Sequence, residues 1–320
     1  MSRSTLSSVT VISSPYHVGL RSSPTRRIGI SEGPDYLKSQ GLVSTIQSFG
    51  LPVHEVEIPP VGDDSKGEIG STFELLRRVS VAVATARNTA SFPIVLSGNC
   101  CTSVGVAAGL ASFVEPLGRE DEYGLGCVWF DAHDDYNIPD TVVSGYFDSQ
   151  GIAMMAGECW KTLLSSIPGF RPLNLRRLIH CGIRDVNDME RRRVEGSGMG
   201  LIWGETNGKV DFAARLRGEL DRRFAEAEDR PMLVHLDLDV LDDSLGKAND
   251  FACPGGLSED DLVRCLQNIT ELTTPMAFTV ASFDPICDGE AAAKRIAAVG
   301  ILAVRTVLES LETKGLLASG

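Results

Sequence analysis

Long apolar runs are absent from this sequence, and basic residues are few. No stretch approaches the roughly 20 consecutive apolar residues that a membrane-spanning helix needs. The 320 residues carry 30 Lys and Arg against 43 Asp and Glu, a net charge of -13 with an isoelectric point of about 4.9. An acidic surface repels nucleic acid and anionic membranes, so we expect neither as a partner. Bound metal ions would neutralise part of this charge.

Cysteine pairs of the CxxC type are also absent. The eight cysteines stand at positions 100, 101, 127, 159, 181, 253, 265 and 287. This usage is too sparse for a disulfide-stapled secreted domain, and we expect reduced, mostly buried thiols in a cytoplasmic protein. Residues 1–31 contain no acid and four arginines, as transit peptides do, but an apparent strand at 9–12 leaves too short a leader.

Strand and helix signals alternate along the chain. Segments typical of strands occur at 9–12, 53–58, 92–97, 127–131, 177–183, 201–203, 232–239 and 277–283. Segments typical of helices occur at 35–49, 73–90, 105–111, 150–165, 210–226, 258–272 and 290–313. This alternation predicts an α/β fold with a mainly parallel central sheet and right-handed crossovers. Because no repeat or linker interrupts it, we expect a single domain over 1–320, with residues 1–8 disordered.

Two apolar segments end in clusters of acids. Val128–Asp135 passes from buried-strand residues to three aspartates and a histidine. In Met232–Asp242, the period of two puts Asp237 and Asp239 on the same side of a strand. Parallel sheets bind ligands at the carboxyl ends of their strands, and an uncompensated buried carboxylate costs several kcal/mol or more. The two segments together therefore predict bound cations.

The spacing of these acids carries a family resemblance. Asp131-Ala-His133-x-Asp135, followed about a hundred residues later by Asp237-x-Asp239-x-x-Asp242, resembles the arginase/agmatinase (ureohydrolase) family. Four further segments match the family in the same order: Gly29–Pro34, Ser97–Cys100, Gly182–Val186 and Pro254–Ser258. The resemblance covers nearly the whole chain. It implies a three-layer α/β/α fold, two bound Mn(II) ions, and a homo-oligomer, either a trimer or a hexamer.

Carried over residue by residue, the resemblance assigns five metal ligands. Asp131 and Asp237 would bridge the two ions, Asp135 would hold one of them, and His133 and Asp239 would hold the other. Carboxylate oxygens with one imidazole suit Mn(II), and a hydroxide between two ions is a strong nucleophile at neutral pH. A single ion, or another divalent metal, is the alternative.

The chain departs from the family at the remaining ligand. Where the family's loop ends in Asp-His, this chain has Asn99-Cys100. A thiolate is a legitimate metal ligand, and beside four carboxylates and two dications it leaves the site one charge unit more negative than a neutral histidine does. Such a site raises the pKa of bound water or weakens that ion, and favours a cationic or more reactive substrate. The alternative is an inert, buried Cys100 beside a single ion.

Two catalytic residues are matched less directly. Asp148, at the end of Ser144-Gly-Tyr-Phe-Asp148, stands where arginases carry a proton-shuttling histidine. It either shuttles a proton, with a raised pKa, or is a loop acid. The glutamate that faces the guanidinium in arginases aligns most simply with Asp284, and Asp288 and Glu290 are nearby candidates.

The residues for substrate specificity match in part. Asn137 and Ser144 correspond to two residues that hold the substrate carboxylate in arginases, while the expected Thr is Val142. Asn187 replaces the acid that meets the α-amine. The chain is most similar to the hydroxyarginine amidinohydrolase-like branch. The resemblance implies hydrolysis of an arginine-like guanidino or hydroxyguanidino compound, such as N-omega-hydroxy-arginine, to urea or hydroxyurea and an amine.

Two other functions stay open. In a thiol-dependent amidino-group enzyme, Cys100 or Cys101 would be the nucleophile and His133 the base, although that chemistry has no use for four carboxylates. A metal-poor arginase-like pseudoenzyme or binding protein is the other alternative. His235 stands where the family has a small polar residue, and it either orients a metal ligand or makes a hydrogen bond in the core.

Overall fold

Eight strands form one parallel sheet at the centre of the molecule. The computed structural model describes residues 5–19, 22–23, 27–62, 67–117, 122–224 and 230–318. The strands of this sheet are β1 (Ser8–Ser14), β2 (Val53–Glu57), β3 (Ser91–Ser97), β6 (Gly126–Phe130), β7 (Leu178–Ile183), β8 (Gly200–Trp203), β9 (Pro231–Asp237) and β10 (Thr274–Ala281). Their order is β2-β1-β3-β10-β9-β6-β7-β8, and every pairing is parallel. The predicted fold class is confirmed.

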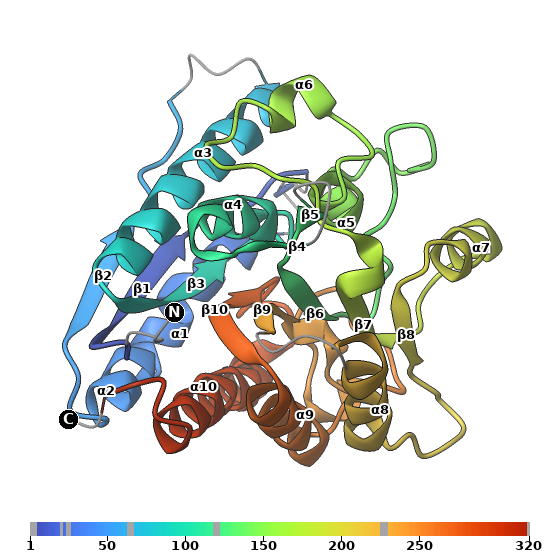
Figure 1. Ribbon diagram of the computed structural model, residues 1–320. Helices are drawn as coiled ribbons and strands as arrows, with labels where there is room; N and C mark the ends of the chain where they lie inside the picture. The colour runs from blue at the N-terminus through green and yellow to red at the C-terminus, as the bar shows by residue number, and fades with distance from the viewer. Residues whose placement is uncertain are drawn as a thin grey trace.

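Helices cover both faces of the sheet (Figure 1). One face carries α3 (Gly67–Asn88), α4 (Thr102–Gly109), α5 (Gly151–Met155) and α6 (Lys161–Leu164). The other face carries α1 (Gly33–Ser39), α2 (Leu42–Gln47), α8 (Phe212–Phe224), α9 (Glu259–Leu272) and α10 (Gly289–Thr313). A small antiparallel pair, β4 (Pro116–Leu117) and β5 (Glu122–Tyr123), was not predicted. None of the helices in the described ranges is long and apolar enough to cross a membrane.

Two hydrophobic cores lie on the two sides of the sheet. Along β6, Val128 and Phe130 pack with α8, α9 and α10, while Cys127 and Trp129 pack with α3, α4 and α5. This is the alternation of a strand that is buried on both faces. Because residues two positions apart project to the same side of a strand, Asp131 projects toward α3 and α4, as Trp129 does.

Four expectations about the elements differ from the structure. The strand expected at 232–239 ends at Asp237, and Asp239 lies in the tight 3-10 turn Leu238–Val240 that follows it, not on the strand. The helix expected at 35–49 is two helices, α1 and α2, because Gly41 adopts a left-handed φ of 98° between them. The helix expected at 150–165 is likewise two short helices, α5 and α6. Disorder over residues 1–8 is wrong for Leu6, whose N–H donates to the carbonyl of Leu316, and for Ser8, which opens β1. Residues 1–4 lie outside the described ranges.

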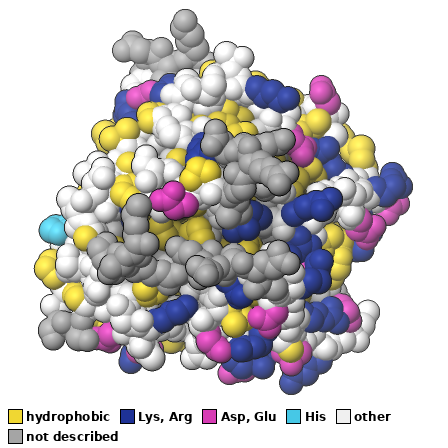
Figure 2. Space-filling model, viewed as in Figure 1, with side chains coloured by type: hydrophobic (Ala, Val, Ile, Leu, Met, Phe, Trp, Pro, Cys, Tyr) yellow, Lys and Arg dark blue, Asp and Glu magenta, His cyan; other side chains and the backbone are white. Residues whose placement is uncertain are grey.

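Helix α7 (Asp188–Gly196) lies beyond β8 and carries a run of arginines. Figure 2 shows basic and acidic side chains interspersed over the side of the molecule that carries α7 and α8. Arg193 lies over the Tyr136 ring, 4.2 Å from its centroid, and donates to the Tyr136 carbonyl at 2.8 Å. These contacts join α7 to the loop that follows β6. The first turn of α7 forms one wall of the site described next.

Candidate metal centre and active site

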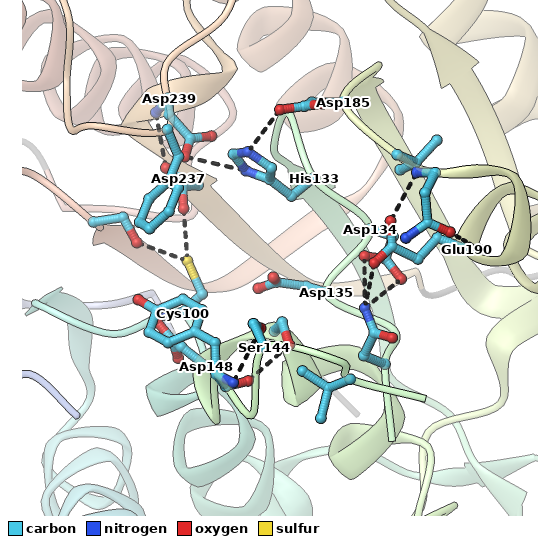
Figure 3. Close-up of a pocket in the computed structure, with 18 of the residues that line it drawn as sticks. Cys100, His133, Asp134, Asp135, Ser144, Asp148, Asp185, Glu190, Asp237 and Asp239 are labelled. Atoms are coloured by element: carbon cyan, nitrogen blue, oxygen red, sulfur yellow. Dashed lines mark hydrogen bonds and ion pairs between the residues drawn. The ribbon is translucent and has the colours of Figure 1, made fainter. Parts of the chain in front are cut away.

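The candidate site lies where four neighbouring strands end. β3 leads to Cys100, β10 to Ser282, β9 ends at Asp237 and β6 leads to Asp131. Since all four strands run parallel, their carboxyl ends meet at the same edge of the sheet. Figure 3 shows the side chains of Cys100, Asp237, His133 and Asp135 turned toward a common space.

The loop that carries Cys100 is held from both sides. A Cβ on Gly98 would lie 2.4 Å from the carbonyl oxygen of Tyr16, so only glycine allows this close approach. The two carboxylate oxygens of Asp148 accept hydrogen bonds from the backbone N–H groups of Cys100 and Cys101, at 3.0 and 2.9 Å. These contacts fix the position of the Cys100 thiol at the start of α4.

The Cys100 thiol points at the acids. Its Sγ donates to Asp237 Oδ2 at 2.9 Å and lies 3.1 Å from Ser282 Oγ. Burial raises the pKa of the Cys100 thiol well above its usual range, and Asp237 and Asp135 reinforce the shift. Because a thiolate is the reactive form of cysteine, this environment disfavours an unassisted thiol nucleophile. A cation between sulfur and carboxylate would reverse the effect.

A second group of ligand atoms forms around His133. His133 Nδ1 lies 3.4 Å from Asp131 Oδ1 and 3.3 Å from Asp239 Oδ2. Burial opposes protonation of this histidine, but Asp239 and Asp131 outweigh it and raise the pKa of His133 well above its usual value. The same pairing holds the pKa of Asp239 below its usual range against the effect of burial. Protonated His133 therefore provides a positive charge between the carboxylates of Asp131 and Asp239.

Negative charges on Asp131, Asp135 and Asp237 would repel one another and those of the neighbouring aspartates. Burial, with Asp239 next in importance, raises the pKa of Asp131 to about 6. Burial and neighbouring aspartates raise the pKa values of Asp135 and Asp237 well above the usual range. Asp135 also adopts a left-handed φ of 44°, a conformation that costs on the order of 1–3 kcal/mol and persists only where the surroundings enforce it. A divalent ion would stabilise the carboxylates by displacing their protons, so these residues fit a metal centre.

A cavity of about 580 Å³ opens above these acids. The predicted substrate-binding residues Asn137, Ser144 and Asn187 all line it. Asn137 Nδ2 donates to Asp134 at 3.2 Å and to Glu190 Oε1 at 3.0 Å. The Asn187 side chain accepts from the N–H groups of Met189 and Glu190, which caps α7. Ser144 is exposed at the rim and accepts from the Tyr146 N–H at 3.2 Å.

Comparison with known proteins identifies the family. The model of the arginase family matches residues 7–307. The chain belongs to the arginase family. Members of this family are ureohydrolases, so the protein is a hydrolase of linear amidine C–N bonds.

Individual members of the arginase family resemble the chain over most of its length. Arginase-1 of Xenopus laevis is 29% identical over 265 residues, which cover 78% of each chain. The crystal structure of Bacillus subtilis arginase has a TM-score of 0.77 at 21% identity, covering 94% of this chain and 98% of that one. Entamoeba histolytica arginase in complex with L-ornithine has a TM-score of 0.77 at 18% identity, covering 95% and 99%. These structural likenesses show the arginase fold.

Both residues predicted to be catalytic accept hydrogen bonds from backbone N–H groups. Asp148 lines the cavity, but both of its oxygens accept backbone hydrogen bonds in the Cys100 loop. Asp284 turns away: its oxygens accept from the N–H groups of Gly29 and Ile286, both at 3.0 Å. Ser282, two residues earlier, lines the cavity instead. Asp284 does not line the cavity, so this geometry gives no support to its predicted place facing a substrate guanidinium. Ser282 adopts a left-handed φ of 61°.

Sequence reasoning missed four residues of the site. Asp185 lies 3.7 Å from His133 Nε2, and Glu190 contacts Asn137. Asn249 donates to Asp239 Oδ2 at 3.0 Å and to the Ser282 carbonyl at 2.9 Å. Asp185 was detectable as the acid within the matched Gly182–Val186 segment, and Glu190 as an acid shortly after it. Nothing in the local sequence marks Ser282 or Asn249, since their importance arises from contacts across the sheet.

The segment after Asp239 is fixed by Arg184. Its guanidinium donates to carbonyl oxygens of Asp239, Leu241 and Cys253, at 2.9, 3.1 and 2.9 Å. Asp242 accepts from Gly255 N–H at 2.8 Å and therefore orders the loop. Together these contacts hold Asp239 at the floor of the cavity.

Proposed function

We propose that this protein is a metal-dependent amidinohydrolase that splits a C–N bond of an arginine-like guanidino or hydroxyguanidino compound. The products would be urea or hydroxyurea and an amine. The observation that supports this most is the convergence of Cys100, Asp131, His133, Asp237 and Asp239 beneath the cavity. Asp135 is the sixth candidate ligand, and its carboxylate points into the same space (Figure 3). Two divalent ions, with Mn(II) as the family's metal, would lower the pKa of a bound water and so supply the nucleophile for attack on the guanidinium carbon.

The chain's own residues would bind and orient the substrate. The wall formed by Asp134, Asp185 and Glu190 is acidic, and the amide nitrogen of Asn137 already donates to two of these acids. We therefore expect an ammonium group of the substrate's tail to bind at this wall. Asp148 would act mainly by positioning Cys100, because its two oxygens are engaged there.

A thiol-dependent mechanism has less support. Among the hydrogen bonds of the described residues, those of Cys100 Sγ run to Asp237 and Ser282, and His133 is paired with carboxylates instead. A thiol nucleophile needs a base within hydrogen-bond reach. Chelation separates the two mechanisms: EDTA should abolish hydrolysis in the metal-dependent case. In the thiol-dependent case, iodoacetamide should abolish hydrolysis and EDTA should not.

The decisive test combines metal content with hydrolysis. Asp131→Asn and Asp237→Asn should lose both bound metal and the release of urea or hydroxyurea from arginine, N-omega-hydroxy-arginine and agmatine. Asp243→Asn, which makes the same change four residues after Asp239, the last candidate ligand of its motif, is the matched control. It should retain metal and activity. Full activity of Asp131→Asn would refute the proposal, and metal without turnover of any guanidino compound would favour a binding protein.

The oligomeric state stays a prediction from the family. A trimer or hexamer would be detected by sedimentation velocity of the purified protein.

A further inference from the structure

His235 occupies an unusual position directly below the acids. It lies in β9 two residues before Asp237, on the same side of the strand, and its side chain is fully buried. Its ring stacks on Trp129 with centroids 3.8 Å apart. Its Nδ1 contacts Thr279 Oγ1 at 2.6 Å and Ser103 Oγ at 2.8 Å. Its Nε2 has no hydrogen-bond partner, and an unpaired polar atom is unfavourable in a buried position.

The surroundings of His235 are those of a metal ligand. A ring nitrogen of His235, the Cys100 sulfur and a carboxylate oxygen of Asp131 all lie within 4.8 Å of one another. Ligand atoms on a tetrahedral ion are separated by roughly 3.5 Å, given metal–ligand distances of about 2.0–2.3 Å. These three atoms would therefore need to move only slightly closer together to bind one ion. Asp237, whose Oδ2 is 2.9 Å from Cys100 Sγ, completes a set of four, and Figure 3 shows these last two side chains facing each other.

The orientation of the ring agrees with this role. Histidines that bind metals almost always use their other ring nitrogen in a hydrogen bond that fixes the ring. In His235 the Thr279 and Ser103 hydroxyls hold Nδ1, which leaves Nε2 to face a ligand. An unpaired nitrogen alone is not sufficient evidence, because buried His180 on β7 has unpaired nitrogens as well. The two histidines differ in that thiol and carboxylate ligand atoms surround His235.

We propose that His235 is a ligand of the inner metal ion, together with Cys100, Asp131 and Asp237. The imidazole that the loop lacks at Cys100 is then supplied by the strand beneath it. A set with thiolate and imidazole is softer than one of carboxylates, and in tetrahedral geometry it selects Zn(II) over Mn(II). The outer position, formed by Asp131, His133 and Asp239, keeps the oxygen-rich character that suits Mn(II). The inference deepens the proposed metal-dependent function and predicts a centre with two different metals.

The first experiment measures metal content and affinity. We would compare wild type, His235→Asn and His180→Asn, each purified without added metal, by elemental analysis and by zinc competition with a chromophoric chelator. Asn keeps a polar atom near the place of Nδ1 and removes Nε2. His235→Asn should bind the inner zinc at least 10- to 100-fold more weakly, since even groups that only orient a ligand contribute that much. His180→Asn, an equally buried histidine in the same sheet, should leave zinc content unchanged.

The second experiment identifies the ligands by spectroscopy. Wild type loaded with Co(II) should show a thiolate-to-cobalt charge-transfer band, which Cys100→Ser should abolish and His235→Asn should shift or weaken. If His235→Asn does not fold, His235→Gln provides the same test, because its amide oxygen lies near the place of Nε2 and should give intermediate zinc affinity. Zinc content and a cobalt spectrum equal to those of His180→Asn in a folded His235 variant would overturn the inference.

Failure of this inference can be told apart from failure of the proposed function. A protein that binds zinc through His235 but hydrolyses no guanidino compound refutes the function alone. A protein that hydrolyses such a compound and keeps its full metal content in the His235 variants refutes the ligand role alone.

Discussion

The stability of the metal-free protein should fall as pH rises, and Asp134 should account for a measurable part of the fall. This side chain is 3% exposed, and its carboxylate accepts from Asn137 Nδ2 at 3.2 Å and from the Tyr136 N–H at 3.3 Å. Burial, with Glu190 next in importance, raises the pKa of Asp134 from 3.8 to about 7. The substitution Asp134→Asn keeps the shape and removes the ionisation.

The sign follows from the direction of this shift. Below pH 3.8 the group is protonated in both the folded and the unfolded chain, so its contribution to stability is fully present. Between pH 3.8 and about 7 only the unfolded chain releases the proton, and stability declines. Above pH 7 the loss is complete. A shift of about 3 units corresponds to about 4 kcal/mol, because each unit is worth 1.36 kcal/mol.

The assay is urea unfolding of the metal-free protein at pH 4.5, 6 and 8, monitored by tryptophan fluorescence in the presence of chelator. Relative to Asp134→Asn, wild type should lose about 3 kcal/mol of unfolding free energy between pH 4.5 and pH 8, because the first part of the loss has already occurred at pH 4.5. Asp140→Asn, an exposed acid of the same loop, is the control and should follow wild type. Titrating acids that do not interact with Asp134 act alike in all three proteins and cancel in the comparison. Parallel pH dependence of wild type and Asp134→Asn would refute the reasoning.

Two further predictions concern the Cys100 loop. Asp148→Asn should lower the unfolding free energy by about 2–3 kcal/mol and reduce metal content, because an amide nitrogen cannot accept the hydrogen bond that one buried backbone N–H now donates. Urea unfolding measures the stability and elemental analysis measures the metal content. A fall in kcat with unchanged stability and metal content would instead indicate that Asp148 is a proton shuttle. Cys100→His should move the activity-pH profile to lower pH, because a neutral ligand replaces an anionic one and lowers the pKa of bound water, and Cys100→Ala should lose the inner ion. If both Cys100 variants keep the parental metal content and pH optimum, Cys100 is not a ligand.

The outline of the site was predictable because motif residues sit at strand ends. Asp131 and Asp237 terminate recognisable buried strands, and parallel strands bring their carboxyl ends together. The role of Asp148 was not predictable, because it depends on N–H groups of Cys100 and Cys101, 48 and 47 residues away along the chain. The place of Ser282 in the cavity lining was equally hidden. Its left-handed φ of 61° is one that serine does not favour by itself.

The sequence alone determined the α/β class, the parallel sheet and the acids that end its strands, because these follow from local periodicity and residue type. Only the tertiary structure decided which strands are neighbours. The order β3-β10-β9-β6 departs from chain order, and it sets Cys100, Ser282, Asp237 and Asp131 side by side. The same order stacks His235 on Trp129 and brings its ring within reach of the Cys100 sulfur. The alternation of β9 sets the side on which His235 lies. Its neighbours, however, come from β6, β10, α4 and the loop after β3, whose positions depend on the packing of both faces of the sheet.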